Sequence, residues 1–172
     1  FKKMEKNVFG EELEICCSNP MTGYFRDGLC KTITEDRGTH TVCAIMTDEF
    51  LNFSASRGND LITAIPYYQF PGLKDGDKWC LCVSRWIEAE KAGKAPKLIL
   101  EATHEKTLEY TSIETLMWAL YSVPIQNHLA RLSGVHRIKT LLEIGVVHAM
   151  GNHRRNIQAA LNHYRHLVPG LI

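Results

Sequence analysis

The sequence lacks an apolar run near the roughly 18 residues that a membrane-spanning helix needs. We also find no secretory signal, no internal repeat and no low-complexity tract. None of its glycines forms a G-x-G-x-x-G or P-loop pattern, so nucleotide binding has no support from a motif. With 45% hydrophobic and 23% charged residues, the 172-residue chain is expected to be a globular protein with one sizeable core and a short appendage.

Acidic residues are scarce in the last third of the chain. Residues 1–110 hold 14 Lys and Arg against 17 Asp and Glu, whereas residues 111–172 hold 6 against 2 and also carry six of the eight histidines. Such asymmetry is typical of an extension with its own partner, either an acidic protein surface or a nucleic-acid backbone.

The pattern of apolar and turn residues predicts strands and helices over residues 1–120, joined by long Gly- and Pro-rich loops. We expect strands at residues 11–17, 41–46 and 97–103. One helix is expected after Thr47 or Asp48, and another between Asp77 and Gly93. A capping box at residues 111–114 predicts a further helix that carries Leu116, Met117 and Leu120.

Residues 121–172 are predicted to form a basic extension of two to three amphipathic helices, two of them antiparallel. Each of these two helices has a stripe of apolar side chains along one face, and a helix cannot bury such a stripe by itself. The helices are therefore expected to pack on each other, and on the main domain or another chain.

Seven sequence blocks carry a resemblance to a known family. They are Cys17–Gly28, His40–Leu51, Arg57–Leu61, Phe70–Asp77, Trp79–Cys82, Arg85-Trp86 and Leu100–Thr103. In this order the chain resembles the domain of unknown function 2237 family, uncharacterised and mainly bacterial, over about residues 8–120. The resemblance implies a small α+β domain without an established activity. Ile33 stands where a glycine is expected, and the helical extension is not part of the family pattern.

Cysteine occurs only in the first 82 residues, at Cys16, Cys17, Cys30, Cys43, Cys80 and Cys82. We expect reduced thiols, because a chain of this length with an ordinary apolar core does not need disulfides. No cofactor is expected except zinc, for which the candidate ligands are Cys17, His40, Cys43, Cys80 and Cys82. The alternative is that the cysteines are small hydrophobic core residues.

A catalytic couple is a further hypothesis for these loops. It would pair the thiol of Cys17 or Cys43 with His40 and with Asp27 or Asp36, because a base beside a thiol raises the fraction of thiolate.

Polar side chains in two Gly-containing loops predict a ligand pocket formed by Arg26, Asp27, Arg57, Asn59 and Asp60. Guanidinium groups pair with carboxylates in a fixed geometry, and glycine allows close approach of a backbone. The alternative is that these side chains hold the long loops together by internal hydrogen bonds.

A basic strip in the extension is the predicted partner-binding surface, with His153, Arg154, Arg155, His163 and Arg165. It suits RNA phosphates or an acidic protein face, and the alternative is a solvated helix face.

The leading hypothesis for the function of the protein is a non-catalytic accessory subunit that docks through its C-terminal helices into a larger protein or ribonucleoprotein assembly. The second hypothesis is an enzyme, or a small-ligand or zinc-binding protein, that uses the Cys/His/Arg loops of the first domain.

The chain begins Phe1-Lys2-Lys3, without an initiator methionine. One interpretation is a mature end left after removal of a targeting peptide, which predicts an intracellular and specifically an organellar, mitochondrial location. A trimmed chain and an observed fragment are the alternatives.

Overall fold

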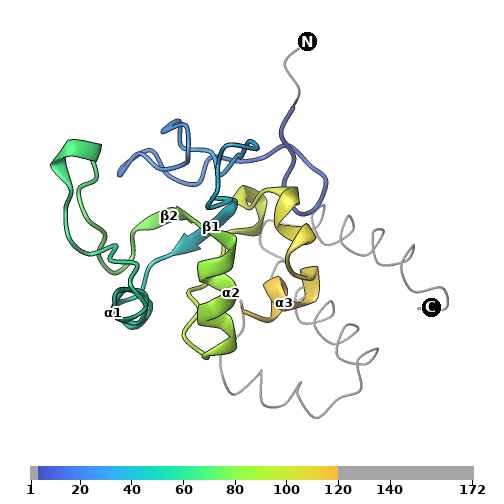
Figure 1. Ribbon diagram of the computed structural model, residues 1–172. Helices are drawn as coiled ribbons and strands as arrows, with labels where there is room; N and C mark the ends of the chain where they lie inside the picture. Colours follow the sequence, from blue (N-terminus) through green and yellow to red (C-terminus); the bar gives the residue numbers. More distant parts are fainter. Residues whose placement is uncertain (1–3, 120–172) are drawn as a thin grey trace. The chain divides into compact units, whose positions relative to one another are not determined.

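A computed structural model describes residues 4–119, which divide between two compact units, Phe1–Ser112 and Ile113–Ile172. In the first unit the described residues form a two-stranded sheet, two α-helices and three short 3-10 helices joined by long loops (Figure 1). This arrangement confirms a small mixed α and β domain. The predicted antiparallel helices of residues 121–172 lie outside the described residues, and the predicted division at residue 120 stays a prediction.

The sheet consists of β1 (Val42–Ile45) and β2 (Lys78–Leu81), which pair antiparallel. Val42 lies opposite Leu81, and Cys43 lies opposite Cys80. The strand predicted at residues 41–46 is thus confirmed, because its β-branched and apolar side chains suit a buried strand. Two strands alone are marginally stable in water, so this sheet depends on the helices and loops that pack on it.

Two helices flank the sheet and contact each other, α1 (Asp48–Ser56) and α2 (Val83–Lys91) (Figure 1). Thr47 is the N-cap of α1, as predicted, and its hydroxyl accepts a hydrogen bond of 3.1 Å from Phe50 N–H. The core contains the side chains of Phe50 and Trp86, both 0% exposed. The indole N–H of Trp86 donates to the carbonyl of Pro96 at 3.2 Å.

Three of the predicted elements are wrong or shifted. Residues 11–17 form no strand; this segment is held by single contacts, such as the bridge of Lys6 with Glu12. Residues 97–103 make one bridge, from Leu98 to Ala44, and then turn into the 3-10 helix η2 (Leu100–Ala102). The predicted helix after Asp77 begins only at Val83, because residues 78–81 are paired in the sheet.

Side chains bind the long loops to the core. Asn7, 1% exposed, accepts hydrogen bonds from the N–H groups of Phe9 and Glu11 and donates to the carbonyls of Glu12 and Glu101. The remaining short helices are η1 (Pro66–Tyr68), η3 (Glu105–Glu109) and, in the second unit, α3 (Ile113–Trp118). The helix predicted after the capping box at residues 111–114 is confirmed by α3, which begins at Ile113, while the capping bonds themselves stay a prediction.

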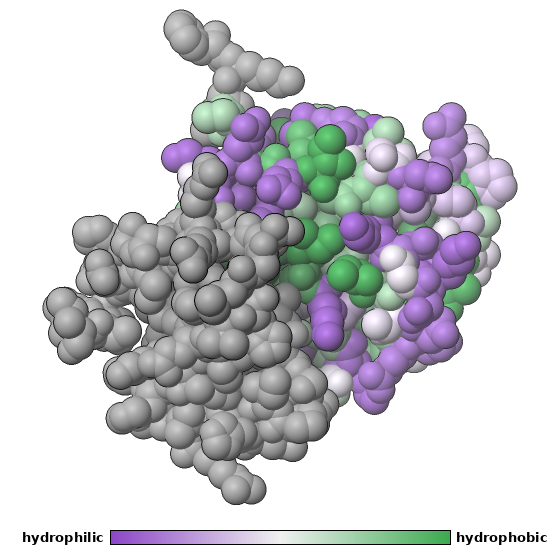
Figure 2. All heavy atoms as spheres, turned by 180° about the vertical axis from the view of Figure 1, so that it is seen from behind, coloured by the Kyte–Doolittle hydropathy of each residue, from purple (hydrophilic) through white to green (hydrophobic). Residues whose placement is uncertain are grey.

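The surface of the described residues is mixed in polarity. Figure 2 shows hydrophobic side chains gathered among hydrophilic ones on one face. Large hydrophobic side chains with more than 40% exposure include Met4, Ile15, Met21, Tyr24, Phe25, Ile62, Ile65, Tyr67, Tyr68 and Tyr110. Among the described helices, none combines the length and the apolar character that crossing a membrane requires.

Removing the cap of α1 is expected to lower stability measurably. Thr47→Ala leaves the Phe50 N–H without its side-chain acceptor, so the free energy of unfolding should fall by about 1 kcal/mol. Urea unfolding would measure the change. Ser56→Ala is the control, since that exposed hydroxyl bonds only the carbonyl of Phe53, within the same helix, and an unchanged midpoint for Thr47→Ala would contradict the assignment.

Candidate active site

The candidate site begins at the loop that leads into β1. The carboxylate of Asp36 accepts a hydrogen bond of 2.8 Å from the backbone N–H of His40 and one of 2.9 Å from the Thr32 hydroxyl. Its other oxygen lies 2.6 Å from Nδ1 of the His40 ring. The Asp36 side chain is completely buried, whereas that of His40 is 34% exposed. Asp36 therefore holds the imidazole in one orientation while leaving one edge open to solvent.

The other ring nitrogen of His40 faces a thiol. Nε2 lies 3.2 Å from Sγ of Cys82, a half-buried cysteine that forms no disulfide. Cys82 is the N-cap of α2, directly after the end of β2. The amide groups at a helix N-terminus favour negative charge that develops nearby. Asp36, His40 and Cys82 thus form a continuous carboxylate–imidazole–thiol chain.

The surroundings of His40 and Asp36 favour the charged forms of both side chains. The hydrogen bond with Cys82 is the largest influence on His40 and raises its pKa to about 9 from 6.5; burial opposes the rise, and the charges of Cys82 and Asp36 support it. Burial would raise the pKa of Asp36, but the hydrogen bonds from the His40 backbone, the His40 ring and Thr32 outweigh burial and hold it below 3.8. At neutral pH His40 is therefore an imidazolium.

The backbone around His40 is shaped for this contact. Thr39 has φ of 49°, which is unusual for a β-branched residue, and such strained residues cluster at functional sites. Its carbonyl accepts a hydrogen bond of 3.1 Å from Val83 N–H, so it ties the loop to the first turn of α2. A Cβ at Gly38 would lie 2.5 Å from the His40 ring and 2.8 Å from Cys82 Sγ. A side chain at position 38 would therefore push the two groups apart.

Aromatic contact completes the exposed side of the site. The Tyr24 ring stacks on His40 with a centroid distance of 6.4 Å and an interplanar angle of 30°. Tyr24 is 42% exposed, so the tyrosine forms an accessible wall beside the imidazole.

The predicted zinc ligands are divided among three places. Cys43 and Cys80 lie in a buried sulfur cluster with Cys16 and Cys30, whereas His40 and Cys82 form the couple described above. The structure contains the disulfides Cys16–Cys43 and Cys30–Cys80, so the prediction of reduced thiols is wrong for these four cysteines in this structure. The fold brings these four sulfurs together from segments that are far apart in the sequence. The spacing of the cysteines along the chain does not indicate this contact. The buried group of Cys16, Cys30 and Cys80 has the proximity to hold a metal ion.

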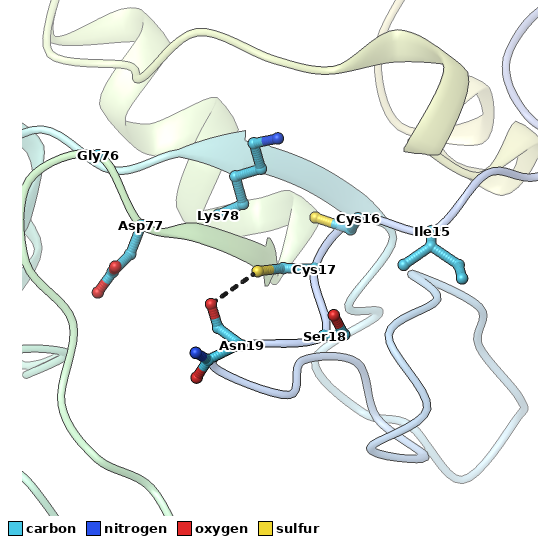
Figure 3. Close-up of a pocket in the computed structure, with 8 residues that line it drawn as sticks. All are labelled: Ile15, Cys16, Cys17, Ser18, Asn19, Gly76, Asp77 and Lys78. Carbon is cyan, nitrogen blue, oxygen red and sulfur yellow. Dashed lines mark hydrogen bonds between the residues drawn. The ribbon is translucent and has the colours of Figure 1, made fainter.

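Cys17, the third place, borders a shallow hollow of about 390 Å³. Figure 3 shows Cys17 and Asn19 on one side of this hollow and, on the other, Asp77 and Lys78, the first residue of β2. The thiol donates a hydrogen bond of 3.2 Å to the carbonyl of Asn19. Cys17 is half-buried like Cys82, but its partner is a neutral carbonyl and not a base.

The residues of the predicted ligand pocket make internal contacts. Arg26 lies over the Trp79 ring at 4.9 Å from its centroid, and Asp27 pairs with Lys31 at 2.5 Å. Arg57 pairs with Glu88 at 2.7 Å. Further along this loop, the amide of Asn59 donates to the Ser54 hydroxyl, and Asp60 accepts from the N–H groups of Ile62 and Thr63. These bonds fit the alternative that the side chains hold the loops together, and ligand binding by them stays a prediction. The basic strip at residues 153–165 lies outside the described residues.

Sequence reasoning selected His40 and Asp36 for a catalytic couple but paired them with Cys17 or Cys43. The structure supplies Cys82 in that place. Cys82 was assigned to zinc because it stands two residues from Cys80, and no sequence signal shows that β2 ends between them.

The fold and the site define a small α+β domain with a buried cluster of four cysteines and a partly buried Cys-His-Asp arrangement. Residues 6–119 match a protein family described as uncharacterised and conserved in bacteria, the domain of unknown function 2237 family, and the chain belongs to that family. No curated protein matches the chain.

Proposed function

We propose that the domain is a cysteine-dependent enzyme that cleaves or transfers acyl groups, with Cys82 as its nucleophile. The observation that supports this proposal is the continuous chain from Cys82 Sγ to His40 Nε2 at 3.2 Å and from His40 Nδ1 to Asp36 at 2.6 Å. A thiol beside an oriented imidazole is the arrangement that activates cysteine nucleophiles. A thiol that serves only as core filling has no need of an imidazolium and a buried carboxylate behind it.

Each group has a definite role in the proposed reaction. The Cys82 thiolate attacks the carbonyl carbon of an acyl substrate, and the developing oxyanion lies near the N-terminus of α2, where the positive end of the helix dipole favours negative charge. His40, protonated at neutral pH, donates its proton to the leaving group. A thioester to Cys82 results, and the leaving group departs with the proton from His40. Water then attacks the thioester with neutral His40 as base, which releases the acid and regenerates the Cys82 thiolate and the His40 imidazolium. Asp36 is a positioning residue that holds the ring.

The two free cysteines of the described residues provide an internal comparison. At pH 7, iodoacetamide is expected to alkylate Cys82 on the order of 10 times faster than Cys17, because Cys82 has an imidazole beside its sulfur whereas Cys17 contacts a carbonyl. Peptide mass spectrometry after timed quenching separates the two sites. His40→Asn should reduce the rate at Cys82 to that at Cys17, and the rate at Cys17 should not change.

Hydrolysis of a chromogenic acetyl ester tests the reaction itself. Wild type and Cys17→Ser should release the chromophore at the same rate, whereas Cys82→Ser should release it only at the uncatalysed rate. Equal alkylation of the two cysteines, or full activity in Cys82→Ser, would show that the thiol is not a nucleophile. The docking hypothesis concerns residues 121–172, which lie outside the described part of the chain, and it stays a prediction.

A further inference from the structure

Four cysteines from four separate segments converge in the core of the first unit. Cys16 and Cys30 belong to the N-terminal loops, Cys43 to β1 and Cys80 to β2. Their exposures are 4%, 0%, 0% and 1%, with Ala102 and Ile99 packed against them. The Sγ atoms of Cys16, Cys30 and Cys80 all lie within 4.8 Å of one another, and Cys43 Sγ is bonded to that of Cys16. All four sulfurs therefore share one buried place.

The sheet fixes two of these sulfurs independently of any disulfide. Cys43 and Cys80 are directly opposite in the β1–β2 register, so their side chains lie on the same face. Their N–H groups do not bond across the ladder; Cys80 donates to the Thr22 hydroxyl at 2.8 Å and Cys43 to the Thr103 hydroxyl at 3.2 Å. In such non-hydrogen-bonded pairs the strands approach more closely. Each of these cysteines nevertheless bonds to a loop cysteine rather than to its neighbour across the sheet.

The dimensions suit a tetrahedral ion. With Zn–S bonds of about 2.3 Å, a tetrahedron has sulfur–sulfur distances of about 3.8 Å. The 4.8 Å limit that encloses the sulfurs of Cys16, Cys30 and Cys80 is thus within about 1 Å of the required size. Cys43 Sγ lies outside this group and adjoins it through its bond to Cys16 Sγ, so it has to turn toward the other two sulfurs when that bond opens. Since Cys16 and Cys30 lie on loops, their sulfurs can move by this amount once the two disulfides are opened.

The donor set also selects the metal. Among the described residues this group contains sulfur ligands only, and four thiolates are typical of structural zinc. Burial leaves no open coordination position for a substrate or water, which distinguishes such a site from a catalytic metal centre.

We propose that Cys16, Cys30, Cys43 and Cys80 form a closed tetrathiolate zinc site in the reduced protein, and that the two disulfides are its metal-free, oxidised form. This set shares only Cys43 and Cys80 with the one predicted from sequence. It is independent of the chemistry proposed for Cys82.

Electrons and protons balance with ordinary thiol reagents. Two molecules of a dithiol reductant each give two electrons and two protons to one disulfide and become cyclic disulfides themselves. The four resulting thiols lose four protons when Zn²⁺ binds. In the reverse direction, two molecules of a small disulfide oxidant each accept two electrons from a pair of metal-bound thiolates, and Zn²⁺ is released.

Metal uptake by the full-length chain tests the site. Reduced wild type should bind one Zn²⁺ per chain by native mass spectrometry, and Co²⁺ in its place should give the visible bands of a tetrahedral ion together with sulfur-to-metal charge transfer. The oxidised protein should show neither. A small disulfide oxidant added to the zinc-loaded chain should release the metal to a chromophoric chelator.

Substitutions separate this site from other ligands. Cys43→Ser and Cys30→Ser should weaken the charge-transfer band and lower the affinity for the metal, because one of the four thiolates is lost, while Cys17→Ser and Cys82→Ser should leave both unchanged. If a core variant does not fold, the reversible gain and loss of zinc by wild type on reduction and oxidation still decides the question. Absence of zinc uptake by the reduced wild type would overturn the proposal. So would a Co²⁺ spectrum with nitrogen ligands alone, as from the histidines of residues 120–172, or loss of the charge-transfer band in Cys17→Ser.

Discussion

The ring of His40 is expected to titrate at a pH of about 9 in the wild type, and Cys82→Ser is expected to lower its pKa by about 1 to 2 units toward the ordinary 6.5. The hydrogen bond and charge of Cys82 are the main reason for the elevated pKa, while burial of the ring acts in the opposite direction. A serine hydroxyl retains a hydrogen-bonding group but carries no charge at these pH values. NMR of the imidazole carbon-bound protons between pH 5 and pH 10 would follow the change.

Two further variants sharpen this prediction. Asp36→Asn should lower the pKa of His40 by less than Cys82→Ser does, since the contributions of Asp36 follow those of Cys82. Cys17→Ser should leave the titration where it is, because Cys17 bonds to the carbonyl of Asn19. A His40 ring that titrates near 6.5 in the wild type would contradict the charged state of His40 at neutral pH. It would also contradict the proposed role of His40 as a general acid at that pH.

The largest loss of stability is expected at Trp86. Trp86→Ala empties a site that is 0% exposed and removes the donor to the Pro96 carbonyl, so the free energy of unfolding should fall by about 3–5 kcal/mol. Since domains are stable by only about 5–15 kcal/mol, this change is a large fraction of the total. Urea unfolding with the disulfides intact would measure it.

Tyr67→Ala is the matched control for the loss of an aromatic ring. Tyr67 is 88% exposed, and its replacement should change the free energy of unfolding by no more than about 0.5 kcal/mol. Trp86→Phe should fall between the two, because it fills most of the volume but cannot donate to Pro96. Similar midpoints for Trp86→Ala and Tyr67→Ala would mean that Trp86 is not a core residue.

Secondary structure is predicted correctly from the sequence where a segment's own residues determine its conformation. The run from Thr41 to Met46 consists of residues that favour strands, and Thr47 carries a hydroxyl that can cap only a following helix. Residues 97–103 have similar composition but form little strand, because pairing depends on which backbone lies alongside. Leu98 reaches Ala44 by a single bridge before the chain turns.

The site was predicted only in part for the same reason. His40 and Asp36 are four residues apart, so their pairing could be inferred, whereas Cys82 reaches them only because β2 places the start of α2 beside that loop. Apolar residues recur at helical spacing across residues 79–87, so the sequence predicts one helix there and does not indicate that β2 ends at Leu81. Membership of the family specified the domain but none of the chemistry.

The boundary between β2 and α2 has a practical consequence. Cys80 is 1% exposed in the core, and Cys82, two residues later, is half-buried beside the partly exposed ring of His40. Cleavage after Lys78 and Arg85 places both sulfurs on one seven-residue peptide, Trp79–Arg85, which stays joined to the peptide of Cys30 until the disulfide is reduced. This one peptide therefore reports two chemical states. At Cys80 it shows whether the buried disulfide had formed, and at Cys82 it shows which reagents in solution had modified the accessible thiol.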